Sequence, residues 1–396
     1  MDQPRGAVTD RARAGASPEQ SGLDAGRLQA AERALQREID AARLPGAVVL
    51  VARDGRVAWQ ASLGRRDPAA GDPMRPDAIF RIYSMTKPIV SAAALMLMEE
   101  GRLLLADPIA QYLPEFAAMT VGTAGEPAAR PITVHDLLRH TSGLTYEFTG
   151  DGPVNRLYAR HRLGDRSVDN AAASAAIARL PLLCQPGTRW EYSRSTDVLG
   201  RVLEVVTGQS LSALLAERIL APLGMVDTAF HVPAGSHHRI AEPFRTDPDT
   251  GGAVRLIDVR EPVAFESGGG GLVSTAADYA RFLQMLLDGG ASGGHRLLGR
   301  KTIDWMTADH LGPMPSESVL LPPGHGFGLG FAVRTHAGLA PVPGSVGQYF
   351  WGGIAGTTFW VDPRERIVAL MLIQAPGRRD YYRQLFRALV HAAIVD

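Results

Sequence analysis

The turn Asp54-Gly55 is the sequence feature that most restricts how this chain of 396 residues can fold. A run of apolar residues leads from Gly46 to the turn, and the segment Arg56-Val57-Ala58-Trp59 leaves it. An Asp-Gly pair between two such runs is a strong signal for a β-hairpin, because both residues tolerate the positive φ that the turn needs. The sequence therefore predicts two paired strands near the N-terminus.

A second pair of strands is expected near the C-terminus, at residues 357–361 and 367–373, on either side of Asp362-Pro363. Helical spacing of apolar residues predicts one helix before the first hairpin, over residues 23–42, and another at the end of the chain, over residues 381–395. Both ends of the chain are therefore expected to be α/β.

The middle of the chain is dominated by helical patterns. The strongest is the segment 88–100, which is apolar nearly all round and is therefore expected to be buried. We expect a flexible tail at residues 1–20, an α/β lobe formed by residues 21–83 and 235–396, and a mainly helical lobe at residues 84–234. Further helices are predicted at residues 134–139, 168–178, 195–207, 210–219 and 276–287. Long polar connections at residues 119–131, 146–168, 232–263 and 311–325 are expected to shape a cleft between the lobes.

The composition narrows the class of function. Hydrophobic residues make up 45% of the chain and charged residues 21%, as in soluble globular proteins. The 41 basic and 41 acidic residues cancel, so a small molecule is a better expected partner than nucleic acid or a membrane. No apolar signal segment is evident, which predicts a cytoplasmic protein. Cys184 is the single cysteine and the histidines lack zinc-ligand spacing, so neither a metal nor another cofactor is expected.

The segment Ser84-Met85-Thr86-Lys87 is the strongest candidate for a reactive site, because it directly precedes the apolar helix. Residues three apart in a first helical turn share a face, so the lysine amine can hydrogen-bond the serine hydroxyl. Such a pair works as nucleophile and base. The chain holds only two lysines, Lys87 and Lys301, among 41 basic residues, so arginine serves wherever a permanent charge suffices.

A rival serine, Ser292, lies in Gly290-Ala291-Ser292-Gly293-Gly294, which fits the G-x-S-x-G pattern. A nucleophile elbow of that kind needs a strand before the serine and a helix after it. Here the pattern follows a predicted helix and consists almost wholly of glycine and alanine. We interpret it as a flexible loop.

Several further motifs accompany Ser84 and Lys87 along nearly the whole chain. They are His140-Thr141-Ser142-Gly143-Leu144, Pro186-Gly187 leading to Trp190-Glu191-Tyr192-Ser193, Ser267-Gly268-Gly269-Gly270-Gly271-Leu272, Gly326-Phe327-Gly328-Leu329-Gly330 and Trp351-Gly352-Gly353. With these motifs the sequence resembles the serine β-lactamase and penicillin-binding-protein superfamily, and most closely the carboxylesterases that look like class C β-lactamases (family VIII esterases).

The resemblance implies an antiparallel sheet with the terminal helices packed on it, a mainly helical lobe, and an active site between them. It also implies that Tyr192 stands beside Ser84 and Lys87 in a proton relay. The backbone N–H groups of Ser84 and Ile354 are implied as the oxyanion hole. Trp351, Gly352 and Gly353 would border the substrate, and we expect Tyr146, Phe148, Tyr349 and Phe350 as further candidates for the pocket wall.

Two departures from the β-lactamase pattern favour an ester over a lactam. Ser193-Arg194 follows Tyr192 where β-lactamases carry x-Asn, and Trp351 replaces a lysine that would attract a lactam's carboxylate. We predict a serine carboxylesterase that hydrolyses short to medium acyl esters through an acyl-enzyme on Ser84. The alternatives are a β-lactamase or D-alanyl-D-alanine peptidase, an acyltransferase, and a penicillin-binding sensor without turnover. Arg194 is expected either to meet an anion or to be an exposed structural arginine.

Overall fold

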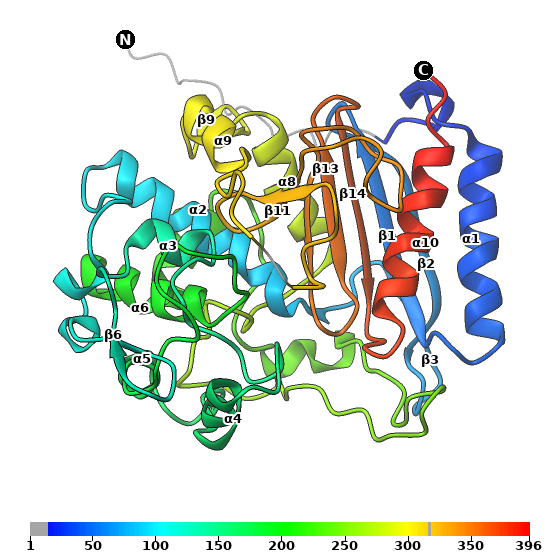
Figure 1. Cartoon of the computed structure of the whole chain (residues 1–396). Helices are drawn as coiled ribbons and strands as arrows, with labels where there is room; N and C mark the ends of the chain where they lie inside the picture. Colours follow the sequence, from blue (N-terminus) through cyan, green and yellow to red (C-terminus); the bar gives the residue numbers. More distant parts are fainter. Residues whose placement is uncertain (1–14, 316–317) are drawn as a thin grey trace, which may run out of the picture.

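An eight-stranded antiparallel sheet forms the centre of the protein, in a computed structural model that describes residues 15–315 and 318–396. Its strand order is β10-β11-β12-β13-β14-β1-β2-β3, so strands from the two ends of the chain meet at the pair β14-β1. Figure 1 shows α1 and α10 together on one side of the sheet and α2 on the other. The predicted fold class, an antiparallel sheet flanked by helices beside a helical region, is confirmed.

The strands of the large sheet come from two parts of the sequence. The N-terminal strands are β1 (Gly46–Arg53), β2 (Arg56–Asp67) and β3 (Asp72–Pro73). The C-terminal strands are β10 (His325–Phe327), β11 (Ala332–Arg334), β12 (Tyr349–Gly352), β13 (Thr358–Asp362) and β14 (Ile367–Ile373). The predicted hairpin joins β1 to β2, and its turn residues Asp54 and Gly55 have φ values of 52° and 75°.

Within the described part of the chain, three two-stranded ribbons lie outside this sheet. They pair β4 (Phe80–Arg81) with β7 (Val273–Ser274), β5 (Thr120–Val121) with β6 (Glu126–Pro127), and β8 (Ala291–Ser292) with β9 (His295–Arg296). The first ribbon matters for function, because β4 leads directly into the segment that holds Ser84.

The helices fall mostly where apolar spacing predicts them. In the described residues they are α1 (Ala25–Asp40), α2 (Thr86–Glu99), α3 (Val134–Leu138), α4 (Pro153–Arg160), α5 (Asn170–Ala178), α6 (Ser195–Thr207), α7 (Leu211–Leu215), α8 (Ala276–Leu287), α9 (Arg300–Met306) and α10 (Arg379–Ala392). No single one of them is long and apolar enough to cross a membrane. The segments Ser195–Thr207 and Leu211–Leu220 meet that length and composition together, but they are bent by 81°.

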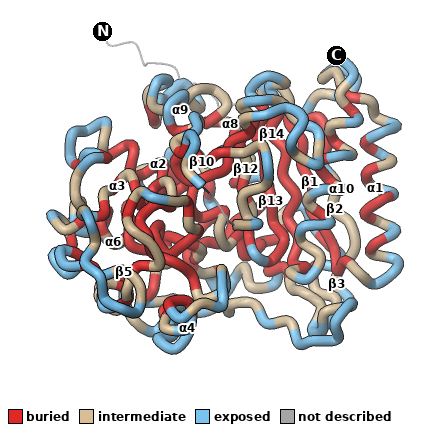
Figure 2. Tube along the Cα trace, in the orientation of Figure 1, coloured by how far each residue is buried: buried red, intermediate tan, exposed pale blue. Residues whose placement is uncertain are grey.

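The sheet has an apolar core on each face. Alternate residues of β14 point to opposite faces, so Val368, Leu370 and Leu372 pack toward α2 and the helical part. Ala369 and Met371 pack instead under α1 and α10. Because both faces are covered, β14 has a continuous apolar sequence. Figure 2 shows β1, β13 and β14 as buried. In α2, every residue from Thr86 to Leu97 is buried, as its apolar sequence predicts.

Some local predictions are wrong. The tail predicted for residues 1–20 holds a short 3-10 helix, Glu19–Ser21, and Ala16 N–H donates to Val57 O, so residues 15–20 are not a free tail. Residues 1–14 lie outside the described residues. The connection at 146–168 contains α4, and α9 was not expected. The helix predicted at 210–219 is α7 followed by a π-helical turn, Ala216–Leu220. The lobe boundaries at 83/84 and 234/235 stay predictions.

Candidate active site

Ser84 lies in a single 3-10 turn, Tyr83–Met85, immediately before α2. The preceding residue, Tyr83, has a φ of 44°, which is uncommon for a residue that is not glycine. Neighbouring segments hold this conformation, since Ile257 N–H donates to the Tyr83 hydroxyl at 3.0 Å and the Tyr279 hydroxyl donates to Met85 O at 2.7 Å. Strained backbone of this kind concentrates at functional positions, because the surrounding structure must enforce it.

Lys87 is fully buried and turns its amine toward Ser84. Its Nζ lies 3.3 Å from Ser84 Oγ and 3.2 Å from the Tyr146 hydroxyl, and it donates to Gly269 O at 2.6 Å. Within residues 15–315 and 318–396, Lys87 forms no ion pair with a carboxylate. The structure therefore brings the predicted Ser84 and Lys87 together, with the amine surrounded by hydroxyl and carbonyl oxygens.

The glycine-rich segment at residues 267–272 holds Lys87 in place. Gly269 offers its carbonyl to Lys87, while its N–H donates to Asp197 Oδ1 at 2.9 Å. The Ser267 hydroxyl donates to the same carboxylate oxygen at 2.5 Å. A Cβ on Gly269 would lie 2.9 Å from both Asp197 Oδ1 and the Tyr146 hydroxyl, so glycine is required there by close approach. The sequence marks this segment by its glycines but gives no sign that it binds the lysine.

Two tyrosines flank the lysine in different ways. The Tyr146 hydroxyl hydrogen-bonds Lys87 directly, and burial together with the negative charge of Asp197 raises the pKa of Tyr146 well above its ordinary value. Tyr146 is therefore a neutral phenol at pH 7. The Tyr192 hydroxyl accepts a hydrogen bond from Trp351 Nε1 at 3.2 Å, and Lys87 Nζ lies 4.5 Å from the centre of the Tyr192 ring. Both tyrosines thus belong to the site, although Tyr146 was expected only in the pocket wall.

The oxyanion hole at Ser84 and Ile354 stays a prediction, and both backbone N–H groups are available for it. Among the described residues, neither Ser84 N–H nor Ile354 N–H donates to a protein acceptor. Gly353, the residue before Ile354, packs against the segment that leads to Ser84, because a Cβ there would lie 2.5 Å from Ile82 O. Both N–H groups are therefore available to a substrate oxygen, as an oxyanion hole requires.

An aromatic cluster surrounds the two tyrosines. It consists of His140, Tyr146, Trp190, Tyr192, Phe327 and Trp351. Its histidine is fully buried, and burial together with the charge of Lys87 holds the pKa of His140 well below its ordinary value. His140 is therefore neutral at pH 7, and its ring packs against the ring of Tyr192, with centroids 4.8 Å apart.

The predicted pocket residues fall in different places. Phe148 stacks on Tyr146 with ring centres 4.7 Å apart and is 54% exposed, so it is open to a ligand. Tyr349 is 1% exposed and stacks on Phe331, which places it in the core. Phe350 points to the opposite face of β12, under the Arg387 guanidinium. Of the aromatic residues on β12, Trp351 is the one that contacts Tyr192.

Arg194 is neither exposed nor free to meet an anion, contrary to both expectations. It is 6% exposed, and its guanidinium donates to both oxygens of Glu147, at 2.9 and 3.0 Å, and lies 3.5 Å from Asp197 Oδ2. Burial opposes its charge, but the two carboxylates outweigh burial and raise the pKa of Arg194. The positive charge of Arg194 is therefore neutralised inside the protein. A hollow of about 360 Å³ opens beside Glu147 and is lined also by Tyr158 and Arg162.

Ser292, the rival serine, lies in the β8-β9 ribbon, away from any strand-to-helix elbow.

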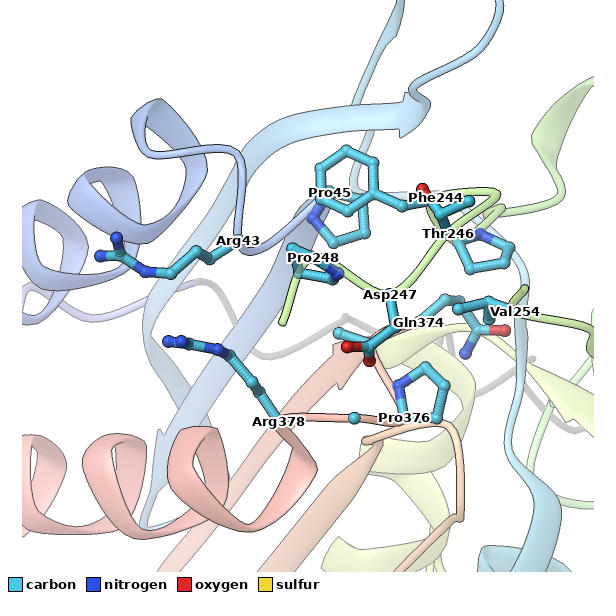
Figure 3. Close-up of a pocket in the computed structure, with 13 residues that line it drawn as sticks. Arg43, Pro45, Phe244, Thr246, Asp247, Pro248, Val254, Gln374, Pro376 and Arg378 are labelled. Atoms are coloured by element: carbon cyan, nitrogen blue, oxygen red, sulfur yellow. The ribbon is translucent and has the colours of Figure 1, made fainter. Parts of the chain in front are cut away.

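Figure 3 shows another hollow, between the start of β1, the segment 243–254 and the loop after β14, with Pro45, Phe244 and Pro376 among its walls. Its space of about 10 Å³ holds roughly one water molecule, so it is too small for a substrate. In the described part of the chain, no three His, Cys, Asp or Glu side chains are grouped as metal ligands would be.

Comparisons with known proteins agree with this fold. Residues 31–393 match the family model described as Beta-lactamase. Protein Rv1367c of Mycobacterium tuberculosis is 40% identical over 85% of this chain and 88% of its own length. Esterase EstB of Burkholderia gladioli is 36% identical over 83% of this chain and 86% of its own length. The solved structure of EstCE1, described as a hydrolase with promiscuous acyltransferase activity, superposes with a TM-score of 0.80 at 30% identity and covers 94% of this chain and 99% of its own.

The fold and the matched relatives define the class of protein as a serine hydrolase with the β-lactamase fold. The chain belongs to the β-lactamase family, within the serine β-lactamase and penicillin-binding-protein superfamily.

Proposed function

We propose that the protein is a carboxylesterase that hydrolyses short to medium acyl esters through an acyl-enzyme on Ser84. One observation carries the proposal: the buried amine of Lys87 lies 3.3 Å from Ser84 Oγ. The backbone N–H groups of Ser84 and Ile354, which have no protein acceptor in the described residues, would supply the oxyanion hole. A nucleophile, a base and an oxyanion hole are the three parts that acyl transfer requires.

In the first half of the reaction, Ser84 Oγ attacks the ester carbonyl. Its proton passes to the relay formed by Lys87 and a tyrosine, and the carbonyl oxygen takes up negative charge between Ser84 N–H and Ile354 N–H. The C–O bond to the alcohol then breaks, and the relay returns the proton to the departing alkoxide oxygen. In the second half, water gives a proton to the same relay and attacks the acyl carbon. The bond from that carbon to Ser84 Oγ then breaks, and the relay returns the proton to Ser84 Oγ as the carboxylic acid leaves.

The surroundings of Ser84 favour an uncharged ester over an anionic lactam. Trp351 stands where β-lactamases carry a lysine, and its ring contacts Tyr192 at a centroid distance of 5.2 Å. Arg194 offers no free charge to a lactam's carboxylate, since Glu147 and Asp197 neutralise it. EstB and EstCE1, named as an esterase and a hydrolase, support the same choice.

A substrate panel tests the proposal. p-Nitrophenyl butyrate, nitrocefin and butyrate esters with added acceptor alcohols are given to wild-type protein and to Ser84→Ala. We expect multiple turnovers on the simple ester, slower turnover of nitrocefin, and a loss of at least about 10³-fold in kcat for Ser84→Ala, because the residues of such a unit act together.

Three outcomes would contradict the proposal. Nitrocefin turnover that rivals ester turnover indicates a β-lactamase. Acyl transfer that exceeds hydrolysis at millimolar alcohol indicates an acyltransferase. A stable acyl adduct, seen by intact mass without release of acid, indicates a penicillin-binding sensor.

A further inference from the structure

We infer that Arg383 of α10 positions the oxyanion hole by holding the peptide bond between Gly353 and Ile354. The inference rests on the proposed function, because it concerns the N–H group of Ile354 as a donor to the reacting carbonyl.

The argument begins with where the Arg383 guanidinium donates. Its Nη2 donates to Gly353 O and, at 3.3 Å, to Thr357 O. Its Nη1 donates to the exposed carboxylate of Asp380 at 3.2 Å, and its Nε has no partner in the described residues. Arg383 thus gives one nitrogen to two carbonyls of the same loop, which joins β12 to β13.

Backbone hydrogen bonds within the loop involve the same two carbonyls, those of Gly353 and Thr357. Gly356 N–H donates to Gly353 O at 3.0 Å, and Gly353 N–H donates to Thr357 O at 2.9 Å. Gly353 O therefore accepts two hydrogen bonds, one from the loop and one from α10. A guanidinium is suited to this position, because its Nη2 carries two hydrogens, one for each carbonyl, and its charge is permanent.

The two faces of β12 place Arg383 and Ser84 on opposite sides of this loop. A Cβ on Gly352 would lie 2.7 Å from Arg383 Nη2, whereas a Cβ on Gly353 would lie 2.5 Å from Ile82 O, two residues before Ser84. Figure 1 shows the same arrangement on a larger scale, with α10 and α2 on opposite sides of the sheet. The loop after β12 is therefore held between Arg383 on one side and the segment that leads to Ser84 on the other.

The geometry of a peptide bond links these observations. The carbonyl of Gly353 and the N–H of Ile354 belong to one planar unit, and in a trans peptide they point in opposite directions. When Arg383 holds the carbonyl toward α10, the N–H must point toward the side of Ser84. The guanidinium also polarises the peptide, which makes the N–H a stronger donor to a developing oxyanion. Burial lowers the pKa of Arg383 to about 10, so its charge is retained at pH 7.

The test compares three variants. Arg383→Met removes the charge and the donors but keeps an apolar stem, and Arg383→Lys keeps the charge without the fork. Arg379→Met is the matched control, because Arg379 lies on the same helix and also donates to a loop carbonyl, Pro376 O at 3.2 Å. For each protein we measure kcat and KM on p-nitrophenyl butyrate, the labelling rate with a fluorophosphonate, and Tm.

If Arg383 positions the oxyanion hole, its removal weakens binding of the transition state more than binding of the ground state. Arg383→Met is expected to lower kcat and the labelling rate by about 10- to 100-fold, toward the loss seen when one oxyanion donor is removed. The affinity for a butyl trifluoromethyl ketone, which forms an oxyanion on Ser84, should fall by a similar factor. The affinity for the matching alcohol, which forms none, should stay within about twofold, and Arg383→Lys should lie between wild type and Arg383→Met.

The inference is wrong if Arg383→Met keeps kcat and labelling within twofold of wild type, or if the ketone and the alcohol lose affinity equally. The second result would make Arg383 a merely structural residue. Failure of the proposed function looks different. Wild-type protein that reacts with the fluorophosphonate but hydrolyses no ester refutes esterase activity, while the labelling rate of Arg383→Met still decides the inference.

Discussion

Gly353→Ala is expected to damage catalysis much more than stability. The added Cβ would lie 2.5 Å from Ile82 O and 2.4 Å from Thr357 Oγ1. The hydroxyl can rotate away, but the carbonyl belongs to the backbone two residues before Ser84. Because a carbon and an oxygen need more than about 3 Å, either the loop after β12 or the turn that holds Ser84 must move by several tenths of an ångström or more.

The size of the effect follows from that displacement. Overpacking at one site costs about 1–3 kcal/mol of folding free energy. A misplacement of about 1 Å between a nucleophile and its oxyanion donors costs on the order of 10²-fold in rate. We therefore expect kcat on an activated ester to fall about 10- to 100-fold, with the protein still folded at 25 °C.

Steady-state kinetics on p-nitrophenyl butyrate and thermal unfolding test this expectation. Gly338→Ala serves as the matched control, because a Cβ on Gly338 would meet nothing within 4 Å. Wild-type kcat in a folded Gly353→Ala protein would refute the placement of Ile354 N–H in the oxyanion hole.

Three further substitutions test the relay and a buried carboxylate of the helical part. Tyr146→Phe removes the hydroxyl 3.2 Å from Lys87 Nζ and should lower kcat about 10-fold or more. Tyr192→Phe should lower kcat about 10²- to 10⁴-fold. An unchanged kcat in Tyr192→Phe would assign the proton relay to Tyr146 instead. Burial opposes the charge of Asp136, but hydrogen bonds from Arg130, Thr133 and Thr141 outweigh it and lower the pKa of Asp136. Its stabilising effect is therefore present above the pKa of the unfolded chain, about 3.9, and is lost as the pH falls through the lower folded value. At pH 7 the free energy of unfolding of Asp136→Asn should be about 2–4 kcal/mol lower than that of the wild type. Below pH 4 its Tm should fall less steeply with pH than the wild-type Tm. Equal slopes in the two proteins would contradict the assignment.

Hairpins, amphipathic helices and the sheet at the two chain ends follow from local patterns in the sequence. Asp54-Gly55 fixes its own turn, and the apolar segments around β14 and α2 have to be buried wherever the chain places them. α4 escaped prediction because its short amphipathic pattern lies inside a polar connection. The order of strands across the sheet depends on contacts between residues hundreds of positions apart, which no local pattern contains.

The candidate site divides in the same way. Ser84 and Lys87 are neighbours on one helical turn, so their spacing predicts their contact. Gly269 and Asp197 come from distant segments, and neither residue type signals a role in holding Lys87. Arg194 was expected either to meet an anion or to be exposed, and its two carboxylate partners within the protein are visible only in the folded chain. The contact of Tyr146 with Lys87 was missed because it joins two distant segments of the sequence.

Covalent labelling of the nucleophile tests the central claim most directly. Wild-type protein, Ser84→Ala and Ser292→Ala are treated with a fluorophosphonate, and the labelled residue is identified by intact mass and peptide mapping. We expect a single adduct on the peptide that contains Ser84, its absence in Ser84→Ala, and an unchanged adduct in Ser292→Ala. An adduct that persists in folded Ser84→Ala, or that maps to Ser292, would contradict the account.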